Sequence, residues 1–132
     1  MESYLIFKGD FKDQNIFNWI KNHIMGAPPP HRFKGDLQVE MDELVFSGFD
    51  LYLKQTITLN IKKYNISQIY HGFDEVFHSG QIRSFGLAYQ PIRLTLEDEA
   101  SGEMDFLYIV AGYNGFVSLN KQVFEEMKQW LS

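Results

Sequence analysis

Short runs of alternating apolar and polar residues, separated by turn signals, fill most of the chain after Phe33. The clearest run contains Ile92, Leu94 and Leu96, and the acidic turn at 98–103 separates it from a second apolar run at 104–110. Alternation with a period of two is typical of strands that bury one face. The number of such runs predicts about seven antiparallel strands, and therefore a mainly β fold.

The other expected strands are read from the same alternation. Turn signals at 42–43 and at SGFD, residues 47–50, bracket a short apolar run, and a long alternating run begins at Leu51. A β-branched run that contains Ile66 and Ile69 follows. RSFGLAY, residues 83–89, is expected to add one more strand before the final hairpin.

The end of the chain has helical rather than strand periodicity. Within residues 119–132, apolar side chains recur at positions i, i+1, i+4, i+7 and i+8: Val123, Phe124, Met127, Trp130 and Leu131. This spacing predicts an amphipathic helix whose apolar stripe packs against the sheet, with Trp130 in the core.

A short strand at residues 4–8 and a helix are expected before the β-rich part. Asp13 is a suitable cap for a helix that runs to about Met25, and Gly26 with three following prolines then forces an extended connection. About thirty residues are too few to fold alone. We therefore expect one domain over residues 1–132, in which residues 1–30 are a strand–helix appendage.

The order of elements over residues 33–131 resembles that of the pleckstrin-homology-like (PH-like) superfold, in particular its bacterial and GRAM-type members. The resemblance rests on the hydrophobic spacing of GDLQVEMDELVFSG, ITLNIKKYNISQI and LYIVAGYNGFVSLNKQVFEEMKQWL. It implies a partly open barrel of two nearly orthogonal sheets, with one end plugged by the C-terminal helix. Such scaffolds bind lipids, peptides or proteins and seldom catalyse reactions, and the fold alone does not choose among these ligands.

Charge weighs against lipid and nucleic-acid partners. The chain has a formal net charge of -5, whereas membranes and nucleic acids are bound chiefly through Lys and Arg. In the superfold that the chain resembles, phosphoinositide headgroups are held by basic residues around the loop between the first two strands. We expect that loop at EMDEL, where Asp42 and Glu43 would oppose the phosphates. Lys62 and Lys63 are interpreted as a solvated turn between strands.

One segment, residues 71–78, raises the question of a metal site. Coiled as a helix, it would place four possible zinc or iron ligands on one face: His71, Asp74, Glu75 and His78. The residues between them are largely apolar, so an amphipathic surface helix explains the same spacing without a ligand. If the segment is extended, successive side chains point to opposite sides and the cluster disperses. We expect a solvated connection between strands and no bound metal.

The remaining motifs exclude several kinds of chemistry. The chain has no cysteine, which excludes thiolate catalysis and disulfides. Its start lacks the features of a signal peptide, and no segment approaches about 18 uninterrupted apolar residues, so a cytoplasmic location is the default expectation. The acidic residues between 97 and 105 lack the spacing of a calcium loop and are expected to keep a hairpin turn solvated.

These observations lead us to expect a small binding or scaffolding module without catalytic activity or cofactor, whose ligand is a protein partner or a second copy of the chain. Two other functions remain open. One is a metal-dependent enzyme or metal-binding protein centred on residues 71–78. The other is a sensor of a small apolar ligand held between helix and sheet.

Overall fold

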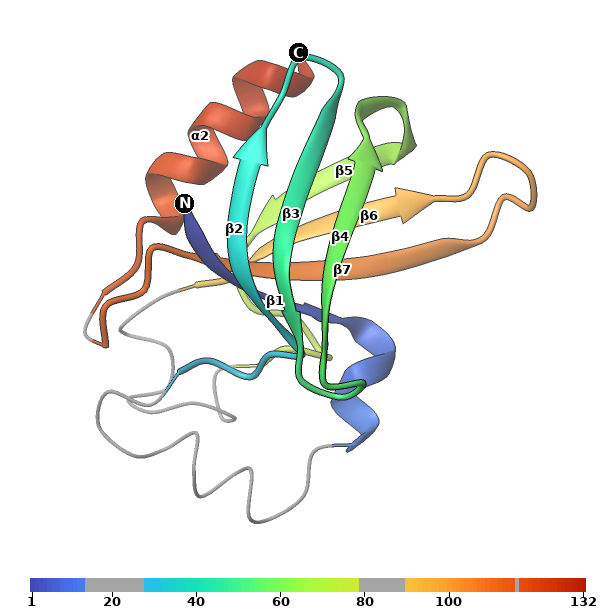
Figure 1. The fold of residues 1–132 in the computed structure, drawn as a ribbon. Helices are drawn as coiled ribbons and strands as arrows, with labels where there is room; N and C mark the ends of the chain where they lie inside the picture. The colour runs from blue at the N-terminus through green and yellow to red at the C-terminus, as the bar shows by residue number, and fades with distance from the viewer. Residues whose placement is uncertain (14–27, 79–89, 116) are drawn as a thin grey trace.

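All strands of the described residues belong to one antiparallel sheet. The computed structural model describes residues 1–13, 28–78, 90–115 and 117–132, and the sheet has the order β4-β3-β2-β1-β7-β6-β5 (Figure 1). The strands are β1 (Glu2–Phe7), β2 (Phe33–Val39), β3 (Glu43–Asp50), β4 (Gln55–Lys62), β5 (Ile66–His71), β6 (Ile92–Glu97) and β7 (Met104–Ala111). The other described elements are the 3₁₀ helices η1 (Lys8–Asp13) and η2 (Lys63–Asn65) and the α-helix α2 (Asn120–Leu131).

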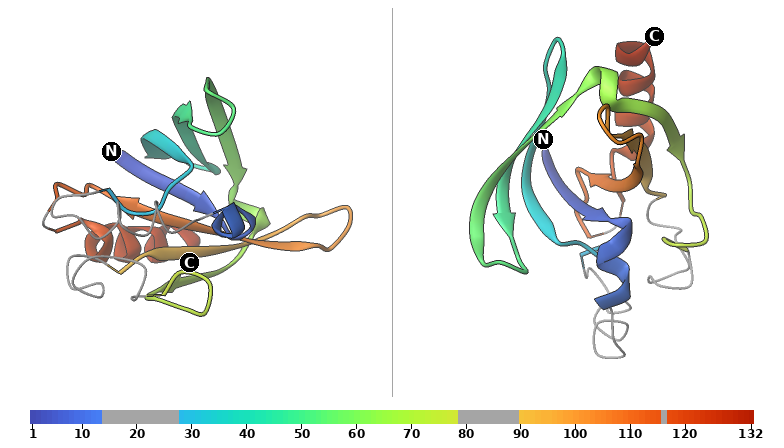
Figure 2. Two further views of the ribbon diagram at one scale, coloured as in Figure 1. Left: turned by 90° about the horizontal axis from the view of Figure 1, so that it is seen from below. Right: turned by 90° about the vertical axis from the view of Figure 1, so that its right-hand side faces the viewer.

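The sheet curls into a half-barrel, and this confirms the predicted mainly β class and the predicted helix at the C-terminal end (Figure 2). β1 pairs with β2 on one side and with β7 on the other. The first strand is therefore the centre of the sheet rather than an addition to a sheet formed by residues 33–131. Beyond Asp13, the helix expected up to Met25 lies outside the described residues, as does the strand expected at 83–89.

Two paired glycines allow β2 and β3 to approach closely. Gly35 lies opposite Gly48 in the register of the two strands. A Cβ atom on Gly35 would lie 2.3 Å from the carbonyl oxygen of Ser47, and one on Gly48 would lie 2.3 Å from that of Lys34. Glycine in a strand interior often marks such a close approach or a bend at a barrel corner.

The turn expected at SGFD is wrong. Residues 47–50 continue β3, and the chain turns at 51–54 instead.

The concave face of the sheet holds the main core, and α2 covers it. Val123 and Met127 of the helix are buried among side chains from both halves of the sheet, whereas Phe124 and Trp130 pack at the margin of this core. The indole Nε1 of Trp130 donates hydrogen bonds to the carbonyl oxygens of Glu40 and Met41, at 2.8 and 3.2 Å. Val123, Phe124 and Met127 thus confirm the predicted stripe, whereas Leu131 lies outside this core and Trp130 bonds to the β2–β3 turn from a half-buried position.

A second, smaller core lies on the opposite face of β1 and β7. Ile6, Tyr108 and Val110 are buried there under Phe77, and Phe11 of η1 packs against them. β1 and β7 are therefore covered on both faces, which explains why their apolar runs are continuous instead of alternating. No helix within the described ranges is long and apolar enough to cross a membrane.

Asn120 anchors the start of α2. This side chain is only 1% exposed; its Oδ1 accepts a hydrogen bond from the Ala111 N–H at 2.7 Å, and its Nδ2 donates to the carbonyl oxygen of Gln90 at 2.8 Å. A buried amide with these partners fixes the start of α2 beside the end of β7.

Candidate functional site

The four possible metal ligands between residues 71 and 78 do not form one site. The segment is not helical: His71 ends β5, and its ring lies 5.1 Å from that of Phe124 on the side of α2. Asp74 instead contacts Arg93 and the Tyr108 hydroxyl, at 3.0 and 2.7 Å. Over the ranges that the structure covers, no three His, Asp or Glu side chains are grouped so that they could hold a metal ion.

Asp74 has a structural role that its sequence context does not reveal. Its Oδ1 accepts hydrogen bonds from the N–H groups of Val76 and Phe77, both at 2.8 Å. Burial alone would raise the pKa of Asp74, but hydrogen bonds from Phe77, Tyr108 and Arg93 outweigh it and lower the pKa. Burial, with the hydrogen bond to Asp74, raises the pKa of Tyr108. The Asp74 carboxylate therefore holds the connection after β5 against the second, smaller core. This connection is partly buried and not merely solvated.

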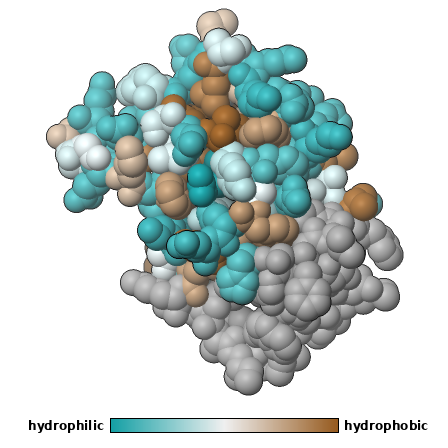
Figure 3. Space-filling view, turned by 180° about the vertical axis from the view of Figure 1, so that it is seen from behind, coloured by the Kyte–Doolittle hydropathy of each residue, from teal (hydrophilic) through white to brown (hydrophobic). Residues whose placement is uncertain are grey.

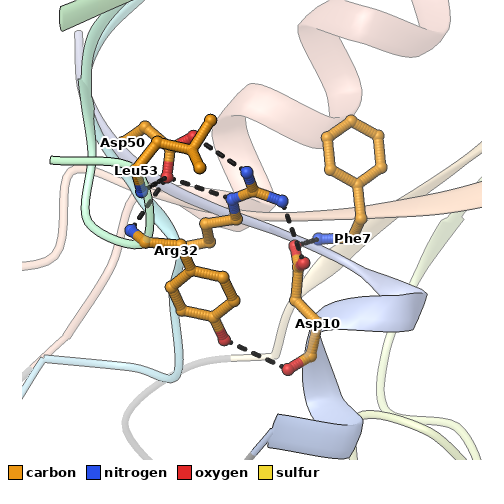
Figure 4. Close-up of polar contacts among 6 residues, drawn as sticks. Phe7, Asp10, Arg32, Asp50 and Leu53 are labelled. Atoms are coloured by element: carbon orange, nitrogen blue, oxygen red, sulfur yellow. Dashed lines mark hydrogen bonds and ion pairs between the residues drawn. The ribbon is translucent and has the colours of Figure 1, made fainter. Parts of the chain in front are cut away.

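A second polar cluster, centred on Arg32 just before β2, joins η1 to the end of β3 (Figure 4). The Arg32 guanidinium donates to both carboxylate oxygens of Asp50, at 3.1 and 2.9 Å, and to Asp10 of η1 at 3.3 Å. Asp50 is 1% exposed, and the hydrogen bond from Arg32 lowers its pKa. The same bond raises the pKa of Arg32. A bidentate pair of this kind fixes geometry as well as charge.

Backbone groups use the remaining acceptor capacity of this cluster. Asp50 also accepts the N–H groups of Tyr52 and Leu53, and Asp10 accepts that of Phe7 at 3.0 Å. The Tyr52 hydroxyl donates to the carbonyl oxygen of Asp10. The charged groups of Asp10, Arg32 and Asp50 bond to one another, and Asp50 also bonds to the turn that follows β3. We therefore interpret the cluster as a structural contact and not as an open ligand site.

A groove lies between β5 and the C-terminal end of α2. It has a volume of about 880 Å³, and its lining consists of Asp42, Leu131 and residues 62–64 and 66–69. Phe124, in the first half of α2, contacts His71, whereas Leu131 at the far end of the helix lines the groove together with Ile66 and Ile69. Figure 3 shows apolar surface framed by hydrophilic atoms on the side of the molecule that carries β5.

The backbone of β5 is exposed to this groove. β5 is an edge strand, and β6 is its only partner in the described sheet. The Gly72 N–H donates to the carbonyl oxygen of Pro91 at 2.9 Å, so every second residue back from Gly72 bonds to β6. In an antiparallel pair the intervening residues direct their N–H and C=O groups away from the partner. Ile69 and His71 therefore present these groups outward, and Ile69 also lines the groove.

Charged groups of both signs surround the mouth of the groove. Lys62 lies 2.8 Å from a carboxylate oxygen of Glu43, and the Lys63 ammonium lies 5.5 Å from the centre of the Trp130 ring. Lys62 and Lys63 connect β4 to β5, as the turn interpretation expects, but they also line the groove. No sequence pattern pointed to this, because the groove arises where α2 diverges from β5.

The strand order corrects the expected position of the loop between the first two strands. These strands are β1 and β2, joined by residues 8–32, whereas EMDEL joins β2 to β3. Asp42 and Glu43 therefore do not lie on the connection between the first two strands, and the expected opposition of these two carboxylates to lipid phosphates does not apply to that connection.

Comparison of the chain with protein-family models, with curated proteins and with solved structures gave no significant match.

Proposed function

We propose that the protein is a small binding module of the PH-like type, and that it binds an extended segment of a protein partner as an added strand along β5. The observation that carries this proposal is the groove of about 880 Å³ beside the outward backbone groups of β5. The position of α2 over the concave face of a curled sheet of seven described antiparallel strands supports the resemblance to the superfold.

The groove offers both elements that strand addition requires. The outward N–H and C=O groups of Ile69 can bond to the backbone of an incoming segment, which gives affinity without sequence preference. Ile66, Ile69 and Leu131 form an apolar floor, where alternate side chains of that segment can be buried. The volume also lies within the range of about 300–1,000 Å³ that is usual for ligand sites.

The proposal can be tested by selecting partners from a displayed library of random, unstructured peptides. We expect selected peptides to share alternating apolar positions and to shift the backbone NMR resonances of residues 66–71 and Leu131. Leu131→Lys places a charge on the apolar floor and should weaken binding about tenfold or more, which corresponds to about 1.4 kcal/mol. Gln129→Lys adds the same charge to an exposed position on the same helical turn and should leave affinity unchanged.

Peptides that bind with equal affinity to the parent and to Leu131→Lys would refute the site. A small molecule retained in native mass spectrometry, whose removal shifts the same resonances, would instead favour a sensor of an apolar ligand.

A further inference from the structure

β4 forms the other edge of the sheet and, unlike β5, it is regular along its whole length. Residues Gln55–Lys62 pair with β3 without any irregularity, whereas the register of β5 shifts between Ile66 and Gln68. No strand in the described part of the chain pairs with the outer edge of β4 (Figure 2). An edge strand without proline or bulge, and without a charge on its inner face, is a template for another strand.

The hydrogen-bond pattern shows which groups of β4 are unpaired. The Lys63 N–H donates to the carbonyl oxygen of Asp42 at 2.8 Å, so residues 61, 59 and 57 exchange bonds with β3. The alternate residues direct their N–H and C=O groups away from β3: Thr56, Thr58, Asn60 and Lys62. The side chains of these residues are exposed on the outer face, whereas Ile57, Leu59 and Ile61 pack partly against the core.

We propose that a second copy of the chain pairs with β4, as an antiparallel strand related by a two-fold axis at Leu59. This register places Leu59 opposite its own copy and Ile57 opposite Ile61. The outward backbone groups of Thr58 meet those of Asn60, and the groups of Thr56 meet those of Lys62. Every inner side chain is then opposite another inner side chain, and no two like charges are paired.

Neighbouring registers are less favourable. A shift of one residue would set the inner face of one strand against the outer face of the other. A shift of two residues in one direction places Lys54 opposite Lys62, and in the other direction it places Ile57 opposite Lys63. The sequence of β4 therefore selects one two-fold register.

Charged groups of opposite sign would lie close together where a second copy pairs with β4. The end of β4 at Asn60 and Lys62 forms one wall of a groove of about 460 Å³, and the acidic β6–β7 hairpin forms the other wall, including Glu97, Asp98 and Glu103. In the proposed register, the turn that precedes β4 in the second copy passes this groove. That turn carries Lys54, an exposed cation with a φ of 55°. Lys54 of each copy is thus brought beside the acidic hairpin of the other.

The proposal is tested by sedimentation velocity over a range of protein concentrations. We expect a reversible monomer–dimer equilibrium that Thr58→Pro abolishes. Because the N–H of Thr58 points outward, proline there removes no bond within the chain, and the melting temperature should stay near that of the parent. Thr58→Val keeps the N–H group and should still form dimers.

A charge exchange tests the same interface without a change of backbone. Lys54→Glu should raise the dissociation constant of the dimer about tenfold, and combining it with Glu103→Lys should restore much of the affinity. Lys121→Glu, which makes the same charge change on the exposed face of α2, should have no effect. A chain that stays monomeric up to about 1 mM, or a dimer that tolerates both Thr58→Pro and Lys54→Glu, would overturn the proposal. So would a dimer that only Leu131→Lys dissociates, because it would use β5.

Discussion

Two carboxylates, that of Asp50 buried and that of Asp74 partly buried, hold together parts of the chain that are far apart in sequence. Asp50 binds Arg32, and Asp74 binds Tyr108 and Arg93, through hydrogen bonds of 2.7 to 3.1 Å. Each carboxylate also accepts N–H groups from the turn that follows it. Removing either one would leave buried donors without acceptors, and this costs more than the net value of an intact pair.

Asp50→Asn should lower the free energy of unfolding by about 3 kcal/mol at neutral pH, near the lower end of the range for buried pairs because Arg32 is partly exposed. The pKa of Asp50 is lowered in the folded state, so its contribution is full above the unfolded pKa and is lost as pH falls through the folded pKa. Denaturant unfolding of parent and variant should therefore show a constant difference above about pH 5 that narrows below about pH 4.

Glu99→Gln is the control for this change, because Glu99 is an exposed residue of the β6–β7 turn. It should alter stability by less than about 0.5 kcal/mol. A difference between parent and Asp50→Asn that does not narrow in acid would show that the carboxylate's charge is not what stabilises the tie.

Neither carboxylate cluster could be found from the sequence. Arg32 is 18 residues from Asp50, and Arg93 and Tyr108 are 19 and 34 residues from Asp74, so only the curl of the sheet brings these groups together. The spacing of His71 and His78 raised the question of a metal site, but that interpretation required a helical backbone. Gly72 has a φ of 151°, and Asp74 accepts hydrogen bonds from the N–H groups of Val76 and Phe77. The segment therefore forms an irregular turn and not a helix.

At the scale of elements, the half-barrel depends on the close approach of β2 and β3 and on the helix that covers its concave face. At Gly35 and Gly48 the two backbones approach too closely for any side chain. The helix supplies Val123 and Met127 to the main core.

Gly48→Ala should destabilise the protein by about 3 kcal/mol or more, because its Cβ would meet the backbone oxygen of Lys34 and not a side chain that can move. Gly9→Ala is the matched control. A Cβ there has no atom within 4 Å, so its melting temperature should stay close to that of the parent. Equal melting temperatures for the two variants would contradict the claim that β2 and β3 pack too closely there for a side chain.

Met127→Ala should cost about 2–5 kcal/mol, since this side chain is 1% exposed within the main core. Glu126→Ala changes the neighbouring exposed residue and should have little effect. Thermal melts of both variants would measure whether α2 is part of the cooperative core. If both melt with the parent, the helix does not contribute to the stability of the half-barrel.

The elements that could be predicted are those whose periodicity agrees with their burial. β6, β7 and α2 follow their apolar patterns, and β4 alternates as expected from Ile57 to Ile61. The central position of β1 could not be predicted, because strand pairing is set by contacts distant in sequence. The turn at 51–54 was missed since Leu51 and Leu53 continue an alternating pattern, although both are exposed.

At the scale of the whole molecule, the open half-barrel leaves two edge strands with different surroundings. β5 borders a groove with an apolar floor, whereas β4 is regular and lies next to an acidic hairpin. The two proposals therefore place the partner segment at β5 and the second copy of the chain at β4. Lys62 borders both surfaces, but Leu131 lines only the groove at β5 and Thr58 lies only on β4, so variants at Leu131 and at Thr58 should affect the two associations separately.

Amide hydrogen exchange of the protein with and without a selected peptide tests the binding role of β5 most directly. Without peptide, the outward N–H of Ile69 should exchange quickly, whereas that of Tyr70, which bonds to β6, should be protected. Saturating peptide should slow exchange at Ile69 about tenfold or more and leave Tyr70 nearly unchanged. Protection that appears at Thr58 and Asn60, or at none of these amides, would contradict the proposal that β5 receives the partner.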